Sequence, residues 1–272
     1  MTDVKNDAHT NTCETPEHAF RLVILDCDGV LIDSEPLAAE ATAFAARAAG
    51  VPLSAEDARK LFTGKDHAYI ADWLLRHGVK DPDAVFRTEA AELNRLIETS
   101  LKPVPGVIET LDALTALGIP WCIASNSGHA RLKRTLGRVG ILPLAEGRIY
   151  SADDVARGKP DPDLHLLCAK TFGIAPSDVL VIDDSVTGIE GARAAGMSAL
   201  GFTGLAPADS EEGSAKALLK AGAFGILLKL NALPELFDFI SSNAPYQAPQ
   251  SEPSQGLKTS TKSAYSIEER TP

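Results

Sequence analysis

The sequence predicts an α/β fold in which helices cover both faces of a parallel sheet and a helical domain is inserted near its start. Short apolar runs alternate with amphipathic helical patterns over most of the 272 residues, an order that is typical of parallel sheets. This alternation stops between about residues 33 and 102, where the periodicity is helical and no strand pattern occurs. The hydrophobic fraction of 44% agrees with a globular protein that buries a core.

The expected strands are short apolar runs bounded by glycine or polar residues, as buried parallel strands are. They cover residues 22–25, 121–124, 179–182, 199–202 and 225–228, with a weaker run near 148–150. Amphipathic helical patterns lie between them at residues 106–117, 130–139, 162–172 and 188–195. The helices between the strands can then cover the two faces of the sheet.

The stretch without strands contains helical patterns at residues 37–49, 55–61, 67–76 and 84–100. Ser54 is a suitable N-cap for the second of them. The predicted division is a disordered tail at 1–18, a core at 19–34 and 103–242, a helical cap domain at 35–102 and a second disordered tail at 243–272. Ligands of open α/β sheets bind beyond the carboxyl ends of the strands, where this insert begins, so the cap can cover a site. A helical layer that merely packs on the sheet fits the same pattern.

The charge of the chain bears on its partners. A formal net charge of −11 leaves no basic face to neutralise a nucleic-acid backbone or an anionic membrane, although local lysines and a metal can still bind a small anion. The amino terminus lacks an apolar signal core, no segment approaches the roughly 20 apolar residues of a membrane span, and the four cysteines are scattered. We therefore expect a reduced, cytoplasmic protein with no nucleic-acid, membrane or obligate protein partner.

Two aspartates, Asp26 and Asp28, follow the apolar run at residues 22–25 and precede Gly29. Because strand side chains alternate with period two, both carboxylates leave the strand on the same side. Like charges this close repel each other, and a cation between them relieves the repulsion. Hard oxygen ligands of this kind suit Mg²⁺, which commonly binds carboxylates, water and substrate phosphate. The pair predicts a site for phosphate chemistry, although a surface turn that closes a strand has the same composition.

Three further segments carry polar groups that suit such a site. Ser125 and Asn126 directly follow one expected strand, and Asp183 and Asp184 directly follow another. Lys159 lies on a loop that two prolines stiffen. Taken singly, each segment is an ordinary helix cap or a solvated surface group. Because the carboxyl ends of parallel strands meet at one edge of a sheet, we expect these groups to converge there around Mg²⁺ and a phosphate.

Four motifs in this order resemble those of the haloacid dehalogenase (HAD) superfamily. They are residues 25–35 (LDCDGVLIDSE), 124–127 (ASNS), 158–162 (GKPDP) and 182–185 (IDDS), the last followed by Gly188, Ile189 and residues 194–197 (AAGM). The similarity is strongest to the sugar-phosphatase and β-phosphoglucomutase-like branch with an α-helical cap, and it covers about residues 19–242. It implies a Rossmann-like core with an inserted cap, and a small phosphorylated sugar, sugar acid or polyol as the substrate.

The resemblance also implies catalytic and metal-binding roles. Asp26 is then the nucleophile that attacks phosphorus and forms an aspartyl-phosphate, and Asp28 is the general acid and base. Mg²⁺ would be held by the side chains of Asp26 and Asp184 and by the backbone carbonyl of Asp28. These assignments are expected roles for the three aspartates.

A phosphate-binding set follows from the same resemblance. Ser125, Lys159 and the backbone of Asn126 would bind the phosphoryl oxygens, and Asp183 is expected to orient Lys159 or a metal-bound water. In capped relatives the lid contacts the leaving group, so Lys65, in a loop of the cap, is a candidate for substrate binding. A solvated charge after the end of a helix explains Lys65 equally well.

Three alternatives to a phosphatase remain. β-Phosphoglucomutase-like relatives typically carry a cap histidine where Ala38 aligns and a lysine where Gly128 stands, so this chain has a weaker grip on a second phosphate. Dehalogenases attack carbon and do not need an acid and base at the position of Asp28. Receiver domains, which are signalling modules, share an acidic Mg²⁺ pocket, a hydroxyl residue and a lysine, but they have no helical insert after the first strand.

Overall fold

The structure is a computed structural model, and it describes residues 20–207 and 210–237. The tails predicted at residues 1–18 and 243–272 lie outside the described residues. Six parallel strands form one sheet in the order β5-β4-β1-β6-β7-β8. The strands are β1 (Leu22–Leu25), β4 (Trp121–Ser125), β5 (Ile149–Ser151), β6 (Val179–Asp183), β7 (Ser198–Phe202) and β8 (Gly225–Leu227). The predicted α/β fold with a Rossmann-like parallel sheet is confirmed.

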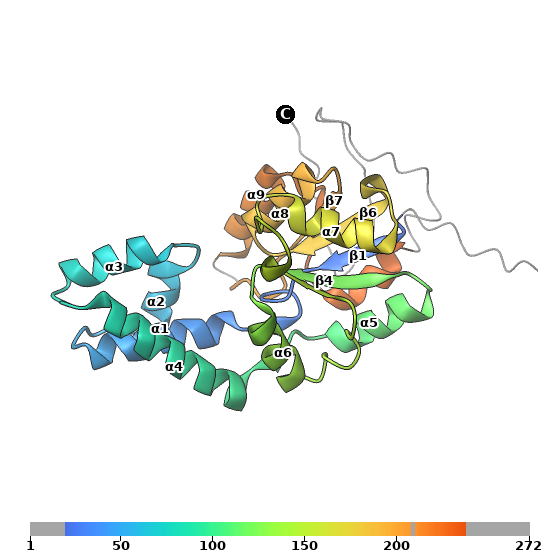
Figure 1. The fold of residues 1–272 in the computed structure, drawn as a ribbon. Helices are drawn as coiled ribbons and strands as arrows, with labels where there is room; N and C mark the ends of the chain where they lie inside the picture. The colour runs from blue at the N-terminus through green and yellow to red at the C-terminus, as the bar shows by residue number, and fades with distance from the viewer. Residues whose placement is uncertain (1–19, 208–209, 238–272) are drawn as a thin grey trace, which may run out of the picture.

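Helices cover both faces of this sheet (Figure 1). They are α5 (Val107–Ala116) and α6 (His129–Arg138) on one face, and α7 (Asp163–Phe172), α8 (Val186–Ala194) and α9 (Glu211–Ala221) on the other. Because side chains alternate along a strand, β1 sends Val23 and Leu25 into the core against α5 and α6. Leu22 and Ile24 enter the core against α7 and α8. This burial on both faces explains why β1 is an uninterrupted apolar run.

The strand order places β1 at the centre, between β4 and β6. Leu25, the last residue of β1, pairs with Ile123 of β4 and with Ile182 of β6. Because all three strands run in the same direction, the residues that follow them emerge side by side at the carboxyl edge of the sheet. The sheet order reverses at β1, since β4 and β5 lie on one side of it and β6, β7 and β8 lie on the other. Open α/β sheets bind their ligands in the crevice at such a switch point.

Between β1 and α5 the chain forms a helical insert that lies beyond the carboxyl end of β1 (Figure 1). It contains α1 (Glu35–Ala48), α2 (Ala55–Phe62), α3 (His67–Arg76) and α4 (Pro82–Ser100). Ser54 is the N-cap of α2, as predicted, because its hydroxyl accepts a hydrogen bond from the Asp57 amide. Phe62, Leu74 and Val85 belong to an apolar cluster within the insert, and its division from the core as a cap domain stays a prediction. Among the described helices, none is long and apolar enough to cross a membrane.

The insert joins the core through a two-stranded ribbon that the sequence does not predict. β2 (Ile32–Asp33) pairs with the antiparallel β3 (Lys102–Pro103), so the entering and leaving segments are hydrogen-bonded to each other. We expected no strand between about residues 33 and 102. This expectation is wrong at the two ends of that segment, where β2 and β3 lie. Strands of two residues are too short to show a periodic pattern, which is why the sequence carries no signal for them.

Candidate active site

A pocket opens at the carboxyl edge of the sheet, where the four predicted motifs meet. The predicted site residues that line it are Asp26, Asp28, Ser125, Asn126, Lys159 and Asp184. Glu35, Ser127 and Thr187 also line the pocket, and none of the three is among the predicted site residues, although Glu35 and Ser127 lie within the quoted motifs. Lys65 does not line it but lies in the loop between α2 and α3, with its ammonium 5.3 Å from the ring centre of Tyr69. A role for Lys65 in substrate binding therefore stays a prediction.

Lys159 joins the first and last motifs through two short hydrogen bonds. Its Nζ donates to Asp26 Oδ1 at 2.6 Å and to Asp183 Oδ2 at 2.7 Å. The side-chain amide of Asn126 fastens the lysine loop to the second motif, because it accepts from the Lys159 N–H at 2.8 Å and donates to the Lys159 carbonyl at 3.0 Å. Only 3% of the Lys159 side chain is exposed, so the ammonium is fixed between the two carboxylates rather than solvated.

The two carboxylates keep Lys159 charged. Burial alone would lower the pKa of Lys159, but the charges of Asp183 and Asp26 outweigh this effect and raise it. Burial raises the pKa of Asp26 to about 7, Lys159 opposes this shift, and the charges of Asp183 and Asp28 add to it. A further cation beside Asp26 would favour its ionised form.

Asp183 positions its neighbours rather than facing the pocket. Its Oδ1 accepts hydrogen bonds from the amide of Ser185 at 2.9 Å and from the hydroxyl of Ser185 at 2.6 Å, and its Oδ2 accepts from Lys159. The residue is fully buried. Both oxygens of Asp183 are therefore engaged by Lys159 and the turn into α8. Asp183 contacts Lys159 directly, and its expected role of orienting Lys159 or a metal-bound water stays a prediction.

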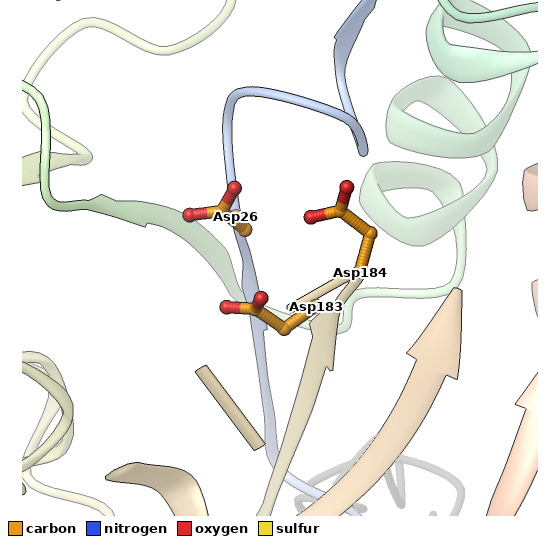
Figure 2. Close-up of side chains that lie close together, drawn as sticks. All are labelled: Asp26, Asp183 and Asp184. Carbon is orange, nitrogen blue, oxygen red and sulfur yellow. The ribbon is translucent and has the colours of Figure 1, made fainter. Parts of the chain in front are cut away.

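Asp26, Asp183 and Asp184 form an acidic cluster at the ends of β1 and β6 (Figure 2), each offering an oxygen within 4.8 Å of the others. Since the oxygens of Asp183 already accept hydrogen bonds, Asp26 and Asp184 are the better placed ligands. Burial raises the pKa of Asp184, and the charges of Asp26 and Asp183 raise it further. Carboxylate oxygens are the hard ligands that Mg²⁺ takes in proteins. The cluster thus has the composition of a divalent-cation site.

The Asp28 carboxylate accepts three hydrogen bonds from side chains. Ser34 and Arg131 donate to its Oδ1 at 2.7 and 2.9 Å, and Ser127 donates to its Oδ2 at 3.0 Å. Burial alone would raise the pKa of Asp28, but the charge of Arg131 and these hydrogen bonds outweigh it and lower the pKa. Protein donors therefore occupy the carboxylate, and the expected metal contact through the backbone carbonyl of Asp28 stays a prediction.

Gly188, in α8, leaves the space that the buried Asp183 carboxylate fills, since a Cβ at this position would overlap that group. Alanine normally stabilises a helix interior by about 1 kcal/mol relative to glycine. We expect Gly188→Ala instead to lower the free energy of unfolding by about 1–3 kcal/mol, because the carboxylate must shift. Denaturant titration followed by circular dichroism measures this loss.

The matched control for this prediction is Gly213→Ala in α9, where a Cβ would meet nothing within 4 Å. This variant is expected to gain up to about 1 kcal/mol, because alanine restricts the unfolded chain more than glycine does. If Gly188→Ala were as stable as the wild type, the packing of Gly188 against Asp183 would not matter for folding.

Comparison with known proteins agrees with this geometry. The profile of the haloacid dehalogenase-like hydrolase family matches residues 20–196. The chain is 32% identical to the 6-phosphogluconate phosphatase of Escherichia coli (strain K12), over 66% of this chain and 81% of that protein. It is 34% identical to hexitol phosphatase A of the same organism, over 69% of this chain and 84% of that protein.

A solved structure supports the same relationship. A HAD family hydrolase from Deinococcus radiodurans R1, with bound phosphate and sodium, has a TM-score of 0.72 and 32% sequence identity. The match covers 86% of this chain and 100% of that chain. The resemblance inferred from the four motifs is thereby confirmed, and the chain belongs to the haloacid dehalogenase-like hydrolase family.

Proposed function

We propose that the protein is a Mg²⁺-dependent phosphatase that hydrolyses small phosphorylated metabolites through an aspartyl-phosphate. The observation that carries this proposal is the position of Asp26, which lines the pocket, bonds to Lys159 and shares an acidic cluster with Asp184. A carboxylate held between an ammonium and a divalent cation stays ionised, and it can attack phosphorus without a separate base. The pocket therefore has a nucleophile suited to phosphoryl transfer.

The proposed reaction has two steps. First, a carboxylate oxygen of Asp26 bonds to phosphorus as the bond to the leaving oxygen breaks, and Asp28 gives a proton to that oxygen. The negative charge of the bound phosphate favours the protonated form of Asp28, against the effect of Arg131 and the serine hydroxyls. Next, a water oxygen bonds to phosphorus, Asp28 takes a proton from that water, and the bond to Asp26 breaks to release inorganic phosphate. The Lys159 ammonium, the Ser125 hydroxyl and the backbone of Asn126 bind the phosphoryl oxygens and offset their charge in both steps.

The metal fits the same groups. Asp26, Asp184 and the backbone carbonyl of Asp28 would hold Mg²⁺. When bound, the ion offsets the repulsion between the nucleophilic carboxylate and the phosphate of the substrate. A backbone contact keeps the ion off the Asp28 carboxylate, which would give up one of its hydrogen bonds from Ser34, Ser127 or Arg131 to carry a proton. Asp183 would support the site through Lys159.

A small phosphorylated sugar, sugar acid or polyol is the proposed class of substrate. One relative is named 6-phosphogluconate phosphatase, another is named hexitol phosphatase A, and the Deinococcus radiodurans structure holds phosphate. The insert begins at the edge of the sheet where the pocket opens, and Glu35 of α1 lines the pocket, so we propose small esters rather than phosphoproteins as substrates (Figure 1). The net charge of −11 argues against nucleic acid and membrane surfaces as partners, and we propose a cytoplasmic location.

We propose hydrolysis rather than a mutase reaction because two residues that would bind a second phosphate in mutase-like relatives are absent from this chain. At Gly128, where mutase-like relatives typically carry a lysine, a Cβ would lie 2.9 Å from Asp153 Oδ2. Asp153 is itself held there, because it accepts a hydrogen bond from the amide of His129 at 2.9 Å. Ala38 stands in α1 at the position of the cap histidine. Conversion of β-glucose 1-phosphate to an isomer in the presence of a catalytic bisphosphate, with no free phosphate, would favour the mutase instead.

Phosphate release from a panel of phosphorylated sugars, sugar acids and polyols tests the proposal. With Mg²⁺ present, the purified protein should release inorganic phosphate from at least one of them. Because a bound metal contributes several kcal/mol of charge stabilisation, chelation should slow release about 100-fold or more, and added Mg²⁺ should restore it. Circular dichroism shows whether the chelated protein stays folded. No release from any ester would contradict the phosphatase, and unchanged release after chelation would contradict the metal.

A further inference from the structure

Arg131, in α6, stands beside the reacting groups of the pocket. Its Nη2 donates to Asp28 Oδ1 at 2.9 Å, and 31% of its side chain is exposed. We propose that Arg131 binds a second anionic group, a carboxylate, on the alcohol that leaves during hydrolysis. The enzyme would thereby select the phosphate esters of acidic metabolites. This inference rests on the proposed phosphatase function and narrows its substrate class.

The position of the leaving group places it near Arg131. In the proposed reaction the leaving oxygen takes its proton from Asp28, so it must lie within hydrogen-bond distance of that carboxyl group. The Arg131 guanidinium lies against the same carboxyl group. An alcohol that leaves at Asp28 therefore departs beside the guanidinium, which can meet a carboxylate carried on the carbon chain of that alcohol.

The guanidinium of Arg131 has donors to offer to such a substituent. An arginine side chain carries five N–H donors in a planar arrangement that matches a carboxylate or a phosphate with two parallel hydrogen bonds. Among the described residues, the hydrogen bond that this guanidinium donates is the single one to Asp28. Ser34 and Ser127 also donate to Asp28, so the carboxylate does not depend on the arginine alone. Arg131 can therefore keep or exchange its bond to Asp28 while it binds a ligand.

The pocket needs a further cation to bind a leaving group that carries a negative charge, because most of its charged lining residues are acidic. Its acidic lining residues are Asp26, Asp28, Glu35 and Asp184. Among the described residues that line the pocket, Lys159 is the only basic one, and its ammonium is already bonded to two carboxylates. A substrate with a second negative charge would be repelled here unless another cation met it. Arg131 supplies that cation at the carboxyl group where the leaving alcohol departs.

The neighbouring arginines of α6 make different contacts, which sets Arg131 apart. Arg134 donates to Asn94 Oδ1 at 2.5 Å, and Arg138 donates to the carbonyl of Glu98 at 2.7 Å. Asn94 and Glu98 belong to α4, so these two arginines fasten the cap to α6. Of the three arginines, Arg131 is the one that contacts a residue lining the pocket.

Two esters of matched length and phosphate position test the inference. One is an aldonic acid phosphate, 6-phosphogluconate, and the other is its alditol analogue, sorbitol 6-phosphate, which carries the phosphate but no carboxylate. We expect Arg131→Ala to lower the ratio of kcat/KM for the acid to that for the alditol by about tenfold or more, because charge-assisted hydrogen bonds are strong. Arg131→Lys keeps the charge and should retain most of this ratio. Lys133→Ala removes an exposed cation from the same helix and should leave the ratio unchanged.

Inhibition by the dephosphorylated products gives a second readout that is independent of turnover on the acid. Gluconate should inhibit the wild type more strongly than sorbitol does, and Arg131→Ala should remove this difference. Circular dichroism checks that each variant is folded. Hydrolysis of the alditol ester is the reaction that these products inhibit. This substrate has no carboxylate, so its own binding does not depend on the proposed contact with Arg131.

Equal losses on the two esters would overturn the inference and make Arg131 a residue that only positions Asp28. A wild type that hydrolyses the alditol ester and not the acid would overturn it as well, as would one that hydrolyses neither of them but cleaves p-nitrophenyl phosphate. In all three cases the phosphatase proposal survives. A wild type that hydrolyses no phosphate ester contradicts the phosphatase proposal itself and the inference with it, so the two failures are distinguishable.

Discussion

Asp26→Asn is expected to lower turnover by about 10⁴-fold or more, because an amide oxygen is a poor nucleophile and the covalent intermediate cannot form. The variant should stay folded, since Lys159 keeps Asp183 as its partner and the new amide oxygen can still accept from the lysine. Steady-state phosphate release measures the loss. Acid quenching of a reaction with labelled substrate should trap a phosphoenzyme in the wild type and none in the variant.

Asp72→Asn is the matched control, because it makes the same chemical change at an exposed aspartate that pairs with Arg76 in the cap. It should retain wild-type turnover and the trapped phosphoenzyme. Near-normal, metal-dependent hydrolysis by Asp26→Asn would remove the nucleophile assignment. Circular dichroism on both variants separates a loss of chemistry from a loss of fold.

Asp28→Asn should lower turnover of alkyl phosphates by about 10²–10⁴-fold, the usual contribution of a positioned proton donor and acceptor. Asparagine keeps an oxygen that can accept from Ser34 or Ser127, so the local hydrogen bonds are largely preserved. It cannot give a proton to the leaving oxygen or take one from water. The expected loss is therefore a loss of proton transfer rather than of packing.

The leaving group distinguishes the two roles of Asp28. p-Nitrophenolate leaves without a proton, so the first step should survive in Asp28→Asn while the second step, which needs a base, stays slow. Rapid mixing with p-nitrophenyl phosphate should then show a burst of p-nitrophenol and accumulation of the phosphoenzyme. Alkyl phosphate turnover at the wild-type rate would contradict both roles of Asp28.

The parallel sheet could be predicted from the sequence because its strands are buried on both faces. The predicted bounds of β1 agree with the structure, and those of β6 are one residue short. Once the strands are known to be parallel, the residues that follow each strand are expected at the same carboxyl edge of the sheet. That rule alone predicted that Asp26, Ser125 and Asp184 would line one pocket, as they do.

The partners of each side chain could not be predicted in the same way, because strand topology fixes an edge but not the contacts along it. Arg131 meets Asp28 across 103 positions of the chain, and no local pattern marks such a pair. Asp183 and Asp184 are adjacent in sequence, yet the first is engaged by Lys159 and Ser185 while the second lines the pocket. Which of the two has oxygens to offer a cation follows only from the folded structure.

The hydrogen bond between Lys159 and Asp26 spans 133 positions of the chain, and Asp184 follows later still. A ribosome therefore exposes the aspartate long before it has translated the groups that complete its surroundings. We expect a nascent chain that ends before β6 to leave cellular phosphate esters untouched. Products of interrupted translation should accordingly be inert, and full synthesis should be a precondition of activity.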